Sequence, residues 1–254
     1  MADPSELRDN DNQESLREGK YMNKKVIAIT VCLTIVLLAA CSGPIYSLTP
    51  NPTAYFSDSP AEYYLYLPSS YTPDKEWPLF VGIHGSDSDG TGCLRMWQEY
   101  AETEPFVLVC PSLADENGGW YMEQGEASLH GIIRQVREEC HVQDKFFLAG
   151  FSAGAAFALA YTYDNPKSIS AVAVLSSGIY IEPWKEVGDI PFLILIGEED
   201  SPAGVEGARN LANLLRQNGT TVELDILPGI RHEIVPQTLQ LTIDLYRRVY
   251  GILP

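Results

Sequence analysis

Basic residues are scarce in this sequence of 254 residues: 17 lysines and arginines stand against 34 aspartates and glutamates, a formal net charge of −17 at pH 7. Negative charge of this size repels the phosphate backbone of nucleic acids and the headgroups of anionic lipids. We therefore expect no nucleic acid as a partner and no membrane contact through surface charge alone. Hydrophobic residues make up 45% of the chain, which is enough for one ordinary globular domain.

Cysteine and histidine are also few. The five cysteines form no CxxC pair and the four histidines form no cluster, so a structural zinc site is not expected. The segment DSDG at residues 87–90 lacks the rest of a twelve-residue calcium loop, and we predict no metal. In an exported domain, two of Cys93, Cys110 and Cys140 could form a disulfide. The sequence leaves all three pairings open, since Cys140 equally suits a small core position.

No apolar run reaches the roughly 20 residues that cross a bilayer core. The longest, residues 26–40, follows Lys24 and Lys25 and ends in Leu-Ala-Ala before Cys41. This order is typical of a secretory signal peptide, here residues 22–40. It resembles the bacterial lipobox, in which the cysteine receives lipid such as palmitate and becomes the mature N-terminus. We therefore expect an exported lipoprotein, anchored to a membrane through Cys41 on its periplasmic or extracellular face. An uncleaved anchor helix is the alternative.

The regions on either side of this signal have different compositions. Residues 1–21 are acidic with almost no large apolar side chain, so we predict that they are disordered, or an extension upstream of a true start at Met22. Residues 41–61 hold four prolines among serine, threonine and asparagine, which predicts an extended tether. The folded domain is then expected over residues 62–254.

Apolar, β-rich segments alternate with helical periodicity in this domain. Seven strands are predicted, at residues 63–67, 79–84, 106–110, 146–150, 171–175, 192–197 and 222–227. Apolar residues at helical spacing occur at Leu129, Ile132, Ile133 and Val136, and again at Ala208, Leu211, Ala212 and Leu215. The pattern predicts an α/β fold with a mostly parallel central sheet, antiparallel at its start, and helices on both faces. About fifteen residues between the fifth and sixth strands are too few for a large cap domain.

The segment GFSAG at residues 150–154 matches G-x-S-x-G, in which a strand turns sharply into a helix with serine at the apex. An apolar strand pattern precedes it and an alanine-rich helical run follows, as this motif requires. Small residues two before and two after the serine let the strand and the helix pass closely. We predict that Ser152 is a nucleophile, although a glycine-bracketed serine in a simple turn would give the same letters.

A serine hydroxyl needs a base within hydrogen-bond reach, and the base needs an acid that orients it. His232 is the only histidine downstream of Ser152, so the order Ser, acid, His assigns it as the base. The segment GEED follows an apolar strand, and Asp200 is the preferred acid because a short turn would aim it back toward His232. Glu199 is the fallback. Either acid could instead be a solvated loop charge.

Ester hydrolysis passes through an oxyanion that preorganised N–H groups must stabilise. We predict the amides of Ala153, after the nucleophile, and Ser86, in the loop IHGSDSDG, as these donors. His84 is expected to brace this loop rather than act as a base. Aromatic residues that follow two of the strands could form a wall for an acyl or aryl group, or be ordinary half-buried side chains; they are Trp120, Tyr121, Tyr180 and Trp184.

Together these motifs resemble the α/β-hydrolase superfamily, and within it esterases of the polyhydroxybutyrate depolymerase-like and feruloyl esterase-like group. The resemblance runs from Tyr63 to Tyr250 and is carried by YYLYLPSSY, LFVGIHG, FVLVCPSL, KFFLAGFSAG, LILIGEED and LPGIRH. It implies an α/β-hydrolase fold and a serine esterase with Ser152, Asp200 and His232 as its triad. Such an enzyme forms an acyl-enzyme from a small-molecule or polymeric ester and needs no cofactor. A serine peptidase and an inactive binding lipoprotein on the same fold remain alternatives.

Overall fold

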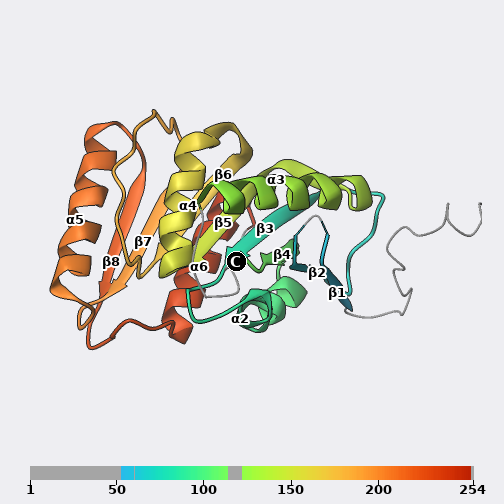
Figure 1. The fold of residues 1–254 in the computed structure, drawn as a ribbon, viewed down its shortest axis with the longest axis horizontal. Coiled ribbons are helices and arrows are strands. Elements are labelled where there is room, and N and C mark those ends of the chain that lie inside the picture. The colour runs from blue at the N-terminus through green and yellow to red at the C-terminus, as the bar shows by residue number, and fades with distance from the viewer. Residues whose placement is uncertain (1–52, 60, 114–121, 253–254) are drawn as a thin grey trace, which may run out of the picture. The chain divides into compact units, whose positions relative to one another are not determined.

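A computed structural model describes residues 53–59, 61–113 and 122–252 of the chain. Eight strands form one sheet in the order β1-β2-β4-β3-β5-β6-β7-β8 (Figure 1). The strands are β1 (Thr53–Ser57), β2 (Tyr63–Leu67), β3 (Trp77–Ile83), β4 (Val107–Pro111), β5 (Val142–Phe151), β6 (Ile169–Leu175), β7 (Phe192–Gly197) and β8 (Val222–Leu227). The helices are α2 (Gly90–Thr103), α3 (Met122–Glu139), α4 (Ala153–Asp164), α5 (Pro202–Gln217) and α6 (Pro236–Tyr250), with a short 3-10 turn, η1 (Pro166–Ser168).

The sheet begins antiparallel and becomes parallel, as predicted. β1 pairs with β2 and β2 with β4 in antiparallel fashion, whereas every pair from β4 through β3 and β5 to β8 is parallel. All seven predicted strands are present, although β3, β5 and β6 begin earlier than expected. Parallel neighbours place their carboxyl ends at one edge of the sheet, and there the loops that carry chemistry meet.

One boundary is wrong in the sequence prediction. Residues 41–61 were expected to be a tether, but Thr53–Ser57 forms the edge strand β1, with Thr53 opposite Leu67 and Ser57 opposite Tyr63. Tyr55 packs against the core while Phe56 is 57% exposed, so this short strand buries only one face.

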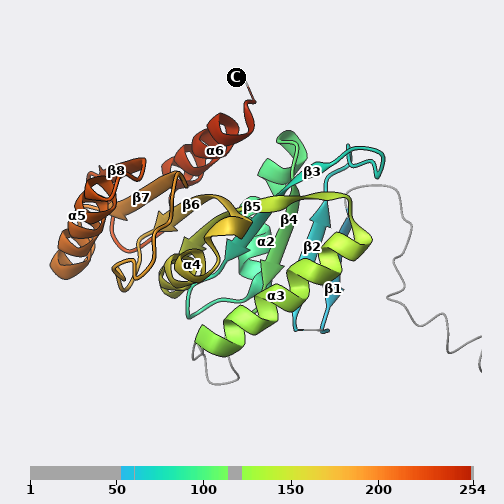
Figure 2. The same cartoon turned by 90° about the horizontal axis from the view of Figure 1, so that it is seen from above.

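Helices cover both faces of the sheet, which confirms the predicted layers. Figure 2 shows α3, α4 and α5 along one face and α2 and α6 along the other. The two faces have separate cores, because successive residues of a strand point to opposite sides. In β5, Phe146 and Leu148 face the first group of helices, whereas Phe147 and Ala149 face the second. The predicted apolar stripes of α3 and α5 are buried in the first core.

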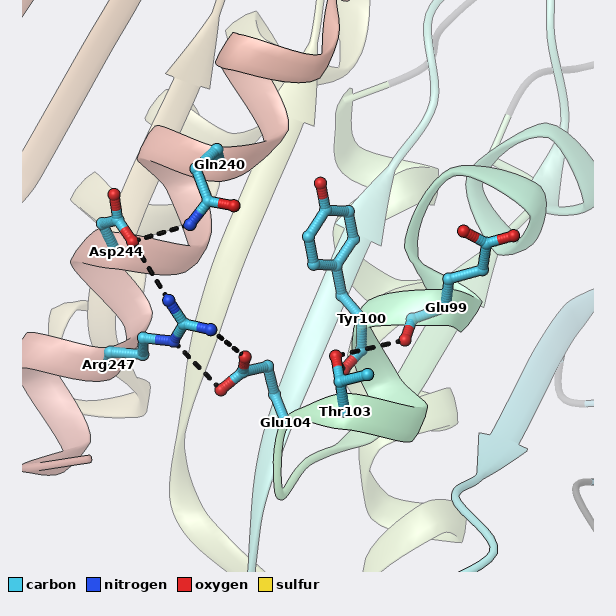
Figure 3. Close-up of polar contacts among 7 residues, drawn as sticks. All are labelled: Glu99, Tyr100, Thr103, Glu104, Gln240, Asp244 and Arg247. Atoms are coloured by element: carbon cyan, nitrogen blue, oxygen red, sulfur yellow. Dashed lines mark hydrogen bonds and ion pairs between the residues drawn. The ribbon is translucent and has the colours of Figure 1, made fainter. Parts of the chain in front are cut away.

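An ion pair joins α6 to the end of α2 (Figure 3). The carboxylate of Glu104, the residue that ends α2, is 6% exposed and accepts two hydrogen bonds from the Arg247 guanidinium, one of them from Nε at 3.2 Å. Asp244 accepts from Arg247 Nη1 at 3.3 Å and from Gln240 Nε2 at 2.8 Å. The charge of Arg247 is therefore shared between a buried carboxylate and one on its own helix.

A disulfide between Cys93 and Cys110 joins α2 to β4, with the two Cα atoms 5.7 Å apart. Cys140 has a free, buried thiol, and burial raises its pKa to about 11. Within the described ranges, no helix combines the length and the apolar character needed to cross a membrane. The predicted signal peptide, residues 22–40, and the predicted lipidation site, Cys41, lie outside those ranges.

Candidate active site

Ser152 lies at the sharp turn between β5 and α4, with φ of 54° and ψ of −115°. A positive φ is strained for any residue with a side chain. Both glycines of G-x-S-x-G are required for steric reasons in this structure. A Cβ on Gly150 would collide with the carbonyl oxygen of Gly154, and a Cβ on Gly154 would collide with the carbonyl oxygen of His84. The motif therefore packs the strand, the helix and the loop after β3 against one another.

The structure brings Ser152, His232 and Asp200 into one hydrogen-bonded chain. The Oγ of Ser152 lies 2.9 Å from Nε2 of His232, and the Nδ1 of His232 lies 2.8 Å from Oδ2 of Asp200. An Nδ1–H that donates to the carboxylate leaves Nε2 free to accept the serine proton. The Asp200 side chain is 8% exposed and that of His232 is 43% exposed. The carboxylate is thus shielded from water, while the imidazole is open to solvent.

Two loops at the ends of β7 and β8 position the acid and the base. Asp200 closes a turn by donating its amide to the carbonyl of Gly197 at 3.2 Å, and its Oδ1 accepts from the Ser201 amide at 2.6 Å. The loop before His232 is tied to the same turn, because the Glu199 amide donates to the Ile230 carbonyl at 2.8 Å. Each oxygen of the Asp200 carboxylate therefore has its own partner.

The fallback acid, Glu199, is not brought to His232. Its carboxylate lies 3.4 Å from Nε of Arg231, and both side chains are largely exposed. The direction of the turn after Gly197 decides between the two acids, since Asp200 faces the histidine loop and Glu199 faces solvent.

The predicted oxyanion donors lie on either side of the nucleophile. Ala153 is the first residue of α4, so its amide has no partner within the helix and lies at the positive end of the helix dipole. A Cβ on Gly85 would lie 3.4 Å from the Cβ of Ser152, which places the loop that carries Ser86 beside the nucleophile. Within the described part of the chain, neither the Ser86 amide nor the Ala153 amide donates to another protein group.

His84 braces this loop, in agreement with its predicted role. Its ring is 3% exposed, with Nδ1 at 2.7 Å from the carbonyl oxygen of Gly85 and Nε2 accepting from the Leu113 amide at 3.2 Å. Burial lowers the pKa of His84, and the bond from Leu113 requires an unprotonated Nε2. The ring is therefore neutral, with its proton on Nδ1.

Sequence reasoning missed the loop after β6, which locks the turn at Ser152. Ser152 donates its amide to the carbonyl of Leu175 at 3.0 Å and accepts from the Gly178 amide at 3.4 Å. Ser176 has φ of 44°, a second strained serine at the end of the neighbouring strand. The only sign in the sequence is the run SSG directly after the strand.

Of the four aromatic residues expected to form a wall, the structure describes only Tyr180 and Trp184. Residues 176–191 form a loop without a helix or strand, so this segment adds no cap over the site. The loop turns back along α4, with Tyr163 donating to the carbonyl of Ile181, and carries Trp184 to Asp164, the last residue of that helix. Trp184 therefore lies away from Ser152 and, of the two alternatives, is a half-buried aromatic side chain outside the site rather than part of a wall. Trp120 and Tyr121 lie outside the described residues.

The described residues contain no group of three or more His, Cys, Asp or Glu side chains arranged to hold a metal ion. Among the described residues, the site holds a serine hydroxyl in hydrogen-bond contact with an imidazole, a carboxylate that orients this imidazole, and two amides without a protein partner. This set of groups suits acyl transfer through a serine-bound intermediate.

Comparisons with known proteins agree with this geometry. The family described as Phospholipase/Carboxylesterase matches residues 115–247. A probable feruloyl esterase C of Aspergillus terreus is 28% identical over 175 residues, which cover 65% of this chain and 64% of that protein. A carboxylesterase of Arabidopsis thaliana is 28% identical over 153 residues, 58% of this chain and 64% of that protein. The matched region thus spans less than two thirds of these relatives.

A solved ferulic acid esterase of Anaeromyces mucronatus has the same fold. It superposes with a TM-score of 0.59 and 16% identity, covering 80% of this chain and 92% of that chain. The predicted α/β-hydrolase fold is confirmed by this likeness and by the family match.

Proposed function

This chain belongs to the phospholipase/carboxylesterase family, and we propose that it is a serine hydrolase that cleaves carboxylic esters through an acyl-enzyme. The observation that carries the proposal is the chain of two hydrogen bonds from Ser152 through His232 to Asp200, at 2.9 and 2.8 Å. Such a chain gives a weakly nucleophilic alcohol the base that it needs.

The reaction follows from these positions. Ser152 Oγ attacks the ester carbonyl carbon while His232 Nε2 takes the serine proton, and Asp200 stabilises the imidazolium that results. The amides of Ser86 and Ala153 donate to the tetrahedral oxyanion. His232 then gives the proton to the leaving alcohol, which leaves an acyl group on Ser152. In the second half, His232 takes a proton from water, the hydroxide attacks the acyl carbon, and the acid is released as the proton returns to Ser152.

For the substrate, we propose an aryl or acetyl ester carried on a saccharide. The names of the relatives, which include feruloyl esterases and a bifunctional acetylxylan esterase/xylanase, support this class. The open position of His232, with 43% of its side chain exposed, suits a bulky alcohol that remains outside the protein.

The test compares the wild type with Ser152→Ala and Asp200→Asn on p-nitrophenyl acetate and methyl ferulate. We expect Ser152→Ala to lose turnover and fluorophosphonate labelling, and Asp200→Asn to lower kcat by about 10⁴-fold, because the imidazole then adopts the wrong tautomer. Activity that persists in Ser152→Ala would refute the proposal. Cleavage of peptide anilides without cleavage of esters would favour the peptidase instead, and a wild type that no probe labels would favour a binding protein.

We also propose that the enzyme is exported and held at a membrane by lipid on Cys41. The sequence LAAC after a short apolar run supports this location, and so does the Cys93–Cys110 disulfide, since disulfides persist in oxidising compartments. Mass spectrometry of the mature N-terminus tests it. A lipid-modified peptide that begins at Cys41 is expected, and an unmodified chain that retains residues 22–40 would contradict it.

A further inference from the structure

Trp184 is a large apolar side chain fixed at the surface. It is 51% exposed, yet its indole is held on two sides. Its Nε1–H donates to Oδ1 of Asp164 at 3.1 Å, and its ring meets that of Tyr163 edge to face, with centroids 5.2 Å apart. Lys185 also binds Asp164, at 2.5 Å, and these bonds lower the pKa of that carboxyl. About half of the Trp184 residue is thus exposed to solvent, while its ring is held in a fixed orientation.

Two hollows adjoin Trp184, which lines both of them. The smaller, of about 220 Å³, has apolar walls from Phe157, Tyr161 and Ile181. The larger, of about 510 Å³, includes the polar residues Gln217, Asn218 and Thr220. Trp184 therefore borders both an apolar hollow and one of mixed polar and apolar lining, an arrangement that suits a ligand with an apolar face and hydroxyl groups at its edge.

The polar groups of the larger hollow are free to bind a ligand. Thr220 is only 5% exposed, and its hydroxyl makes no hydrogen bond with another described residue. The side-chain amides of Gln217 and Asn218 likewise have no partner among the described residues. These groups both donate and accept, as hydroxyl groups of a ligand require.

The charges around Trp184 favour a neutral ligand. Asp164 and Lys185 cancel each other, and the other charged residues at the two hollows, Glu126 and Glu186, are acidic. Anions are repelled by these carboxylates and by the net charge of the protein. We propose that Trp184 and its two hollows form a binding site for a neutral sugar unit of a saccharide, with the C–H face of the sugar on the indole and its hydroxyls on Gln217, Asn218 and Thr220.

This site is separate from the catalytic residues. Trp184 binds the last residue of α4, and Ser152 precedes the first, so the length of a 12-residue helix, about 18 Å, lies between them. A saccharide of several units could bind at Trp184 while an ester group lies at Ser152. The link to catalysis rests on the proposed function, but sugar binding at Trp184 does not require hydrolysis.

Binding is tested by calorimetry in the full chain carrying Ser152→Ala, which removes turnover. The probe is xylohexaose, a neutral, unesterified saccharide, and the anionic control is hexagalacturonic acid. We expect xylohexaose to bind, Trp184→Ala to weaken binding by about tenfold or more, and Trp184→Phe to retain part of it because a flat ring remains. Phe56→Ala, at another exposed aromatic residue, is the matched control and should leave the affinity unchanged. Equal affinity in Trp184→Ala, or stronger binding of the anion, would overturn the proposal.

A kinetic arm separates this proposal from the hydrolase proposal. In the active enzyme, Trp184→Ala should raise KM for a feruloylated xylo-oligosaccharide and leave kcat and KM for p-nitrophenyl acetate unchanged. If the wild type binds xylohexaose but cleaves no ester, the hydrolase proposal fails and the sugar site stands. If esters are cleaved but xylohexaose does not bind, the sugar site fails alone.

Discussion

The Nδ1 of His84 donates a hydrogen bond to the carbonyl oxygen of Gly85 at 2.7 Å, and that carbonyl belongs to the same peptide group as the Ser86 amide. A trans peptide is planar, so its C=O and N–H point in opposite directions. A bond that holds the Gly85 oxygen therefore also sets the direction of the Ser86 N–H. His84 is a positioning residue in the proposed mechanism, since it acts through this peptide rather than on the substrate.

Replacing His84 with Asn or Gln separates its bond to Gly85 from its bond to Leu113. An Asn amide nitrogen can take the place of Nδ1 and keep the bond to Gly85, whereas the Gln side-chain oxygen can only replace Nε2 and accept from Leu113. We expect His84→Gln to lower kcat for p-nitrophenyl acetate by about 10²-fold, as when an oxyanion donor is lost, and His84→Asn to lower it far less. Equal kcat values in the two variants would contradict this role.

The same residue makes stability depend on pH. Burial lowers the pKa of folded His84 below its ordinary value of 6.5. The unfolded chain therefore binds the proton first, and the contribution of His84 to stability, complete above about pH 6.5, is lost as the pH falls from there toward the folded pKa. Urea unfolding of the wild type between pH 7.5 and 5 should show a steeper fall in the free energy of unfolding than His84→Asn shows. Parallel curves would rule out this assignment.

Most of the site was predictable because its motifs restrict the choices strongly. G-x-S-x-G requires a particular turn at Ser152, and a single downstream histidine leaves one base, so the structure finds both side chains in contact. The catalytic roles themselves stay predictions. The position of Trp184 was not predictable, because residues 176–191 form an irregular loop, and only the packing of that loop along α4 decides which end of the sheet it reaches.

The disulfide pairing and the first strand could not be predicted from the sequence either. Cys93 and Cys110 belong to the core on one face of the sheet and Cys140 to the core on the other, a division that depends on contacts distant in sequence. β1 has five residues between prolines, and its composition matches that of a linker. Its pairing with β2 comes from tertiary packing rather than from local preference.

Reduction of the disulfide should loosen the start of α2. Cys93 and Cys110 are 17 residues apart. A disulfide that closes a loop of this size lowers the entropy of the unfolded chain and so stabilises the folded protein by about 3 kcal/mol. We expect dithiothreitol, or the double substitution Cys93→Ala with Cys110→Ala, to lower the melting temperature by several degrees. Cys140→Ala with dithiothreitol absent is the comparison, since Cys140 has no disulfide partner. A reduced protein that melts like the oxidised one would contradict the expectation.

Arg247 should matter more for stability than its neighbour Arg248. Arg247→Met leaves the Glu104 carboxylate, 6% exposed, without its partner, which costs about 3 kcal/mol (Figure 3). Arg248 pairs with Glu223 at 2.7 Å, but both side chains are about half exposed, so Arg248→Met should cost less than about 1 kcal/mol. Urea unfolding measures the free energy of unfolding of both arginine variants. Adding Glu104→Gln to Arg247→Met should recover part of the lost stability, because no unpaired carboxylate then remains buried. Equal losses of stability in Arg247→Met and Arg248→Met would refute the argument.

Ser152 carries backbone strain that a glycine would relieve. At φ of 54° and ψ of −115°, a residue with a Cβ is strained in the folded state by of order 1–3 kcal/mol, whereas glycine adopts this conformation freely. Against this gain, glycine makes the unfolded chain more flexible, which lowers the free energy of unfolding by about 0.5–1 kcal/mol. Ser152→Gly should therefore be inactive and melt a few degrees above the wild type. Ser152→Ala, equally inactive, keeps the Cβ and the strain, so its melting temperature should stay near that of the wild type. If the glycine variant were no more stable than the alanine variant, the turn at the nucleophile would hold no strain, and the position of Ser152 would have to follow from its hydrogen bonds to Leu175 and Gly178 alone.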